Sequence, residues 1–133
     1  MHKPVFARIA GMEYPLCLTV AALDELDTAG YGINDICRLL TPDEGLTVEQ
    51  IAKNVVWLLD ILLREGEQNR HCLADAGDEL LPVPTLEELC HMLTPIDAMN
   101  LRPALMEATM ASITVAVEAD KEAPGNGDGA AQA

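Results

Sequence analysis

The stretch from Thr47 to Asn69 constrains the fold more than any other part of this chain. It opens with Thr47-Val48-Glu49-Gln50, the pattern of a capping box at a helix N-terminus. The apolar residues that follow recur at helical spacing and cover more than half the circumference of a helix. Such a helix is enclosed on several sides by its own chain or packs against another subunit. We expect its apolar surface to exceed what one small fold can bury, and hence a homo-oligomer or a partner.

The remaining stripe of this helix is polar, with Lys53, Asp60, Arg64 and Glu67. Trp57, the only tryptophan, lies at its centre. A tryptophan in this setting can anchor an interface, with cation–π support from Lys53, or it can be covered by another element of the same fold. We take Lys53, Trp57, Asp60 and Arg64 as candidate protein-binding residues.

Methionines gather in the C-terminal third of the chain, and Met106 and Met110 complete the candidate protein-binding set. Flexible thioethers can pack against varied apolar partners, although filling gaps in the core is their more common use. Both interpretations remain open for these two residues.

Residues 5–19 have the pattern of an N-terminal β-hairpin. Two short segments that favour strands flank a turn at Ala10-Gly11, and Pro15 belongs at an edge because it cannot donate to a ladder. Thr19 then caps a helix over 20–29, with Val20, Leu23 and Leu26 facing inward and Gly30 ending it.

Shorter helices are expected around the central one. Asn34 is placed to cap a helix over 35–40, and Thr85 opens a second capping box for a helix to about Leu93. Residues 71–84 are expected to form a loop. Thr94-Pro95 predicts one turn of helix through Met99.

Asn100 is placed to cap a last helix, in which Met106, Met110, Ile113 and Val117 share a face. Residues 113–117 also alternate with a period of two, so a strand is the alternative, and the methionine spacing favours the helix. The chain is therefore expected to be mainly α with a small hairpin, α+β in class. One domain spans 1–118, and 119–133 form a disordered acidic, Ala- and Gly-rich tail.

The charge balance excludes several classes of partner. Eight Lys and Arg stand against 22 Asp and Glu, for a net charge of −14. Phosphate backbones and anionic membrane surfaces bind clustered basic residues, so we expect neither nucleic acid nor a membrane as partner. The densest apolar run, Val55 to Leu63, is far shorter than the roughly 20 residues of a spanning helix.

Catalytic and metal signatures are weak. His71-Cys72 and Cys90-His91 offer zinc-type ligands, but neither pair has the spacing of a zinc motif. Cys37 and Cys90 lie in apolar helical stretches where a reduced cysteine behaves as a small core residue. We interpret all four cysteines as free thiols in a reducing cytoplasm. No phosphate-binding loop, nucleophile elbow or metalloprotease motif is present, so we expect no enzyme, cofactor or metal.

The N-terminal block resembles the tail assembly chaperones of long-tailed bacteriophages. These proteins open with a hairpin that carries a G-x-x-Y-x-L core, followed by an A-L-x-E-L helix and a later apolar W-L-L helix. The matching positions are Gly11, Tyr14, Leu16, Ala22, Leu23, Glu25 and Leu26, and then Trp57-Leu58-Leu59. The resemblance extends over roughly 5–117.

The resemblance implies a non-enzymatic, oligomeric protein in the cytoplasm of an infected or lysogenic host cell. Members of this family are thought to coat the tape measure protein, keep it soluble and bring tail tube protein subunits to it. They leave before the virion is complete, and many also exist as a longer form made by ribosomal frameshifting. The His-Cys pairs have no counterpart in the family pattern.

The acidic surface leaves a second hypothesis open. A chain with this charge can mimic a nucleic-acid backbone and block a basic host protein. That acidic inhibitor would carry regularly spaced acids along one face and form a salt-sensitive complex. Keeping an apolar-rich protein soluble is the ordinary role of such charge.

Overall fold

The computed structural model describes residues 4–41, 45–74 and 77–122, with 114–122 described by their backbone alone. Its class is α+β, as predicted. The elements are β1 (Val5–Ile9), β2 (Met12–Leu16), α1 (Val20–Thr28), a 3₁₀ turn η1 (Ile33–Asp35), α2 (Ile36–Leu40), α3 (Val48–Leu73), α4 (Leu86–Met92) and α5 (Pro95–Glu122).

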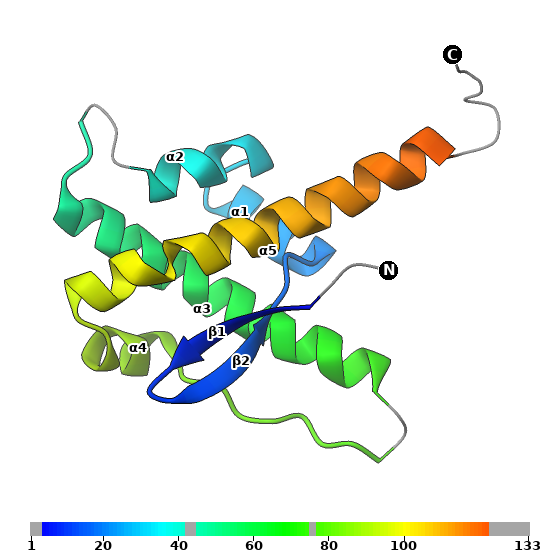
Figure 1. The fold of residues 1–133 in the computed structure, drawn as a ribbon, viewed down its shortest axis with the longest axis horizontal. Helices are drawn as coiled ribbons and strands as arrows, with labels where there is room; N and C mark the ends of the chain where they lie inside the picture. Colours follow the sequence, from blue (N-terminus) through cyan, green and yellow to red (C-terminus); the bar gives the residue numbers. More distant parts are fainter. Residues whose placement is uncertain (1–3, 42–44, 75–76, 123–133) are drawn as a thin grey trace.

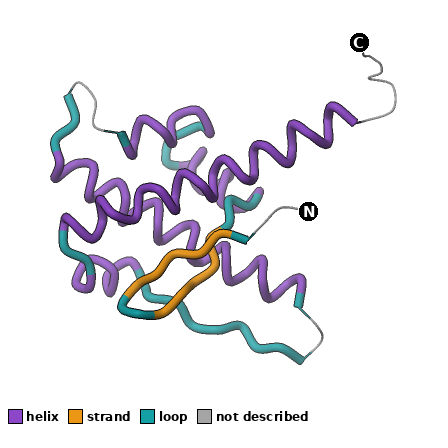
Figure 2. The backbone as a smooth tube through the Cα atoms, in the orientation of Figure 1, coloured by secondary structure: helices purple, strands orange, loops and turns teal. Residues whose placement is uncertain are grey.

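Two long helices, α3 and α5, form the framework. Helix α5 crosses α3, with α1 and α2 toward one side of the pair and the hairpin and α4 toward the other (Figure 1). Figure 2 shows the long loop after α3 returning beside the hairpin to reach α4. Helix α3 contacts β2, α1, α2, α4 and α5, so it is the centre of the domain, as expected.

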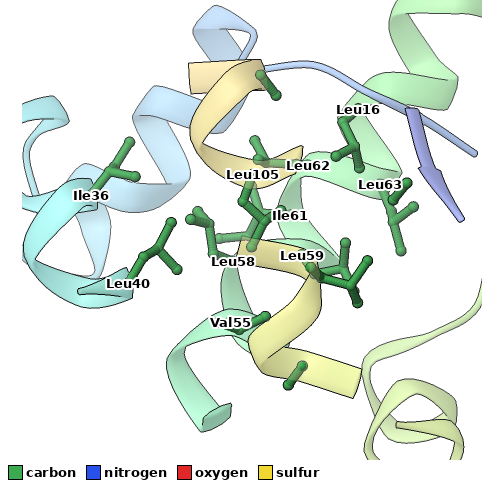
Figure 3. Packing of buried hydrophobic residues seen from close by; sticks show 14 of the residues in the cluster. Leu16, Ile36, Leu40, Val55, Leu58, Leu59, Ile61, Leu62, Leu63 and Leu105 are labelled. Carbon is green, nitrogen blue, oxygen red and sulfur yellow. The ribbon is translucent and has the colours of Figure 1, made fainter. Parts of the chain in front are cut away.

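The fold encloses the apolar face of α3 within a single chain. Side chains such as Val55, Leu58 and Ile61 have no exposed surface, and Leu105 of α5 packs among them (Figure 3). The expectation that this helix carries more apolar surface than one fold can bury is therefore wrong. Its surface is covered because five elements surround it, and its exposed large apolar residues, Val48 and Leu73, lie at its two ends.

The hairpin has the predicted form. Its strands pair antiparallel from Val5 with Leu16 to Ile9 with Met12, leaving Ala10 and Gly11 as a two-residue turn. Both turn residues have positive φ, 52° and 83° respectively, which the tight primed turns of hairpins require. Pro15 pairs with Phe6. Hydrogen-bonded and non-hydrogen-bonded pairs alternate along the hairpin, and counting from the turn the Phe6–Pro15 pair is one without hydrogen bonds. The missing N–H of Pro15 therefore removes no hydrogen bond from the sheet.

Gly66 lets the hairpin lie directly on α3. A Cβ built at this position would meet the carbonyl oxygen of Pro15 at 2.0 Å and the Cα of Leu16 at 2.9 Å. The amide of Cys17 also donates to the carbonyl of Leu62, at 3.3 Å. The backbone of β2 can therefore contact α3 directly at Gly66, because glycine has no side chain in the way.

Helix caps follow the sequence closely at four positions. At the start of α5 the Thr94 hydroxyl accepts from the amide of Asp97 at 3.2 Å. Thr47 and Thr85 accept from the amides of Gln50 and Glu88, and both capping boxes are complete. The Thr19 hydroxyl accepts from the amide of Ala22 and donates to Glu65 of α3 at 2.7 Å, so it caps α1 and joins it to α3.

The buried face of α1 and the cap before α2 differ from the predictions. Val20 is exposed, because Ala22 and Leu26 form the buried face of α1 together with half-buried Leu23. Asn34 does not cap α2; the Asp35 carboxylate instead accepts from the amide of Gly32 at 2.7 Å and opens the preceding 3₁₀ turn.

Helix α3 runs past Asn69 to Leu73, so the first residues of the predicted 71–84 loop are helical. Arg70 lies in its last turn, where a positive charge favours the carbonyl end of a helix.

The two helices predicted after Thr94 are one continuous helix, and residues 113–117 belong to it, which confirms helix over strand there. Pro103 removes the amide that would bond the carbonyl of Met99, and the Arg102 side chain donates to that carbonyl at 3.1 Å. No break therefore forms at Asn100. Residues 119–122 of the predicted disordered tail are helical, and 123–133 lie outside the described residues.

Candidate functional site

Lys53 and Trp57 come together at one pocket. It has a volume of about 500 Å³ and lies between α3, α4 and the start of α5. Trp57 is half-buried, and its ring lies 5.5 Å from that of Tyr31 at an angle of 59°. Lys53 pairs with Glu49 one turn earlier, at 3.0 Å. The tryptophan thus packs against its own fold on one side and borders an open apolar pocket on the other.

Asp60 and Arg64 instead form a link between helices. The Arg64 guanidinium donates to Glu25 of α1 at 2.7 Å and to Asp60 at 3.0 Å. Hydrogen bonds to Glu25, and then to Asp60, raise the pKa of Arg64 above its ordinary value. Asp60 is buried rather than part of an exposed polar stripe. These two candidates hold α1 against α3.

The two candidate methionines lie on α5 and line neither the Trp57 pocket nor the groove described next. Met106 is half-buried and packs against the core, whereas Met110 is exposed. The structure therefore brings the six candidate residues into three separate places rather than one surface.

A larger apolar groove lies beside the hairpin. None of the six candidate residues taken from the sequence lines it, although Glu67 of the predicted polar stripe does. It has a volume of about 800 Å³ and is bounded by β1, β2, the end of α3 and residues 81–83. We call it the hairpin groove; its apolar wall includes Phe6, Met12, Tyr14, Leu73, Leu81 and Val83.

An ion pair between buried Glu67 and half-buried Arg70 holds the loop wall of this groove in place. Glu67 is almost fully buried and accepts from Arg70 at 2.6 Å and from the amide of Leu81 at 2.7 Å. Arg70 also donates to the carbonyl of Glu79 at 2.7 Å. The hydrogen bonds from Arg70, and that from Leu81, lower the pKa of Glu67 although burial opposes the shift. The sequence placed Glu67 on an exposed stripe, because helical spacing cannot show that the following loop folds back over it.

One signal for the groove was present in the sequence. A glycine inside a long helix is costly, so Gly66 indicates that another backbone approaches there. The hairpin sequence did not indicate the groove. Alternating side chains on a strand are also expected when one face of the strand is simply exposed to solvent.

The described cysteines are all free. Cys37 and Cys90 are exposed, contrary to the expectation of core positions, because the buried faces of α2 and α4 are formed by Ile36, Leu40 and Leu89. Cys17 is buried, and burial, with the nearby charge of Glu65, raises the pKa of its thiol. Across the described ranges, no cluster of three or more His, Cys, Asp or Glu side chains is placed to hold a metal ion.

Of the helices that the structure describes, none combines the length and apolarity needed to cross a bilayer. Comparison with known proteins gives no match: no family model, no curated protein and no solved structure matches this chain.

Proposed function

We propose that this chain is a tail assembly chaperone of a long-tailed bacteriophage or prophage. In this role it binds the tape measure protein without catalysis, keeps it soluble and helps to bring tail tube protein subunits to it. It acts in the host cytoplasm as a homo-oligomer along the client and is absent from the mature virion.

The observation that carries the proposal is the open apolar groove at the hairpin. The groove is built on the same N-terminal block that resembles the chaperone family. Soluble proteins seldom expose large apolar surfaces without a use, and such surfaces mark sites of protein association. A chaperone needs such a surface for its client and a strong net charge to keep the complex in solution.

The positions of the resemblance also have defined structural roles. Gly11 occupies the turn with positive φ, Leu16 seats β2 on α3, and Glu25 binds Arg64. Ala22 and Leu26 form the buried face of α1. These roles support the resemblance because the motif residues contribute to the turn of the hairpin and to the packing of the hairpin and α1 on the central helix.

Co-expression with the tape measure protein encoded in the same genome tests the proposal. The soluble fraction of that protein should rise strongly with this chain and not with an unrelated, equally acidic protein. An equal amount of precipitate in the presence and absence of this chain would reject the proposed function. Adding tail tube protein and recovering all three proteins together tests the recruitment step.

Gene order gives an independent check. A chaperone of this class should lie between a gene for a tail tube protein and a gene for a very long helical protein. A neighbourhood without tail genes would count against the proposal.

A further inference from the structure

Exposed apolar side chains concentrate around the hairpin groove. Three of its wall residues are large and well exposed: Phe6 at 48%, Met12 at 61% and Leu73 at 78%. Leu81, on the loop opposite the hairpin, is exposed at 52%. Exposed apolar surface of this kind gains free energy when a partner removes it from water.

The groove continues into a second hollow toward α4. This hollow has a volume of about 600 Å³ and shares Met12, Tyr14, Pro82 and Val83 with the hairpin groove. Its far side is formed by residues of α4: the acidic Glu87 and Glu88, together with His91 and Met92. The two hollows therefore adjoin one another along the hairpin and residues 82–83.

The backbone around these hollows is poorly suited to strand addition. A strand that joins a sheet edge needs free amides on the edge that it meets. Glu13 and Pro15 are the two positions of β2 whose backbone faces the free edge, and Pro15 has no amide to offer. The facing loop contains Pro82 and Pro84. This arrangement favours recognition through side chains, as when an amphipathic helix lies in a groove.

The charges beside the two hollows are mainly acidic. Glu87 and Glu88 line the hollow at α4, and neither takes part in a salt bridge among the described residues. Arg70, the basic residue in the groove wall, is already engaged by Glu67 and the carbonyl of Glu79. The site thus presents an apolar floor with negative charge at its border.

We propose that the hairpin groove and its extension toward α4 bind one amphipathic helix, whose apolar stripe is flanked by Lys and Arg. This inference rests on the proposed function in one respect: the tape measure protein is taken as the natural source of the helix. A second copy of this chain is a poorer occupant, because each copy has a net charge of −14 and would bring like charge to an acidic border.

Binding of synthetic peptides to the full chain tests the proposal. The probe is a labelled peptide that is mostly unfolded when free and long enough for about five helical turns, with leucines at helical spacing flanked by lysines. The control peptide has glutamate in place of lysine. Fluorescence anisotropy should give an affinity for the lysine peptide at least about tenfold higher than for the glutamate peptide. The lysine peptide should gain helicity on binding, and its affinity should fall as salt is raised.

Matched variants locate the site. Replacing Phe6, Met12 and Leu73 together by Gln should weaken binding of the lysine peptide at least about tenfold. All three are exposed, so the fold should persist, which circular dichroism verifies.

The control variant replaces Val20, Ile96 and Met110 by Gln; these side chains are also exposed and apolar but lie outside the groove. It should bind within about twofold of the wild type.

Three results would overturn the inference: equal binding by the two triple variants, equal binding of the two peptides, or binding without gain of helicity. Self-association through the groove that strengthens with salt and excludes the peptide would instead assign the surface to a second copy, and would also overturn it.

These outcomes are separable from the proposed function. If the groove variant still keeps the tape measure protein soluble, the inference fails while the function stands. If the peptides behave as expected but the tape measure protein precipitates regardless, the function fails and the groove remains a helix-binding site.

Discussion

At the scale of single residues, Gly66 shows how a side chain that is missing can position a whole element. In an isolated helix, alanine would be favoured over glycine by about 1 kcal/mol. Here a Cβ would lie 2.0 Å from the carbonyl oxygen of Pro15, which is backbone and cannot rotate away. The steric cost therefore exceeds the gain in helix propensity.

We expect Gly66→Ala to lower the free energy of unfolding by about 2 to 4 kcal/mol, because the hairpin must move off α3. Gln68→Ala, at an exposed position of the same helix, is the matched control and should stay within about 0.5 kcal/mol of the wild type. Denaturant unfolding measures both. A neutral or stabilised Gly66→Ala protein would show that the hairpin is not seated on this glycine.

Glu67 gives a prediction for pH. Its pKa lies below the ordinary value of 4.5, chiefly because Arg70 donates to the carboxylate. A carboxyl with a lowered folded pKa contributes stability that is complete above its unfolded pKa and is lost as the pH falls through the folded pKa.

At neutral pH the wild type should exceed Glu67→Gln in free energy of unfolding by about 1 to 3 kcal/mol. Below about pH 4.5 this difference should shrink as the carboxylate is protonated. Unfolding curves of both proteins at several pH values measure the difference. A difference that stays constant down to pH 3 would contradict the contribution of the charged pair.

At the scale of elements, local sequence chemistry predicted helix starts better than helix ends. The threonines at 19, 47, 85 and 94 cap as expected, because a cap depends on residues three positions away. The continuous α5 could not be predicted locally. Its passage through Pro103 depends on Arg102, whose guanidinium bonds the carbonyl of Met99 and also that of Leu40 at the end of α2, at 3.2 Å.

A double-mutant cycle tests this account of α5. Arg102→Leu should lower the free energy of unfolding by about 1 to 2 kcal/mol, since two carbonyls lose a charged donor. In a Pro103→Ala background the loss should be smaller, because an alanine amide at position 103 can bond the carbonyl of Met99. Strictly additive effects in thermal or denaturant unfolding would show that Arg102 does not compensate for the proline.

At the scale of the whole molecule, the larger apolar groove open to partners lies at the hairpin and the end of α3, not along the apolar middle of α3. The periodicity of residues 51–63 correctly predicted a buried helix, but a helical pattern cannot show how many neighbours surround it. The candidate site was largely beyond prediction for the same reason. Its walls come from β1, β2, the end of α3 and residues 81–83, which meet only when the loop folds back onto Glu67.

Hydrogen exchange of the chain with and without its bound tape measure protein tests the central claim most directly. The account predicts slower exchange in the hairpin, at the end of α3 and in residues 77–92, with little change at α1 and α2. Slower exchange confined to α1 and α2, or to the residues of α3 around Trp57 and the start of α5, would contradict it.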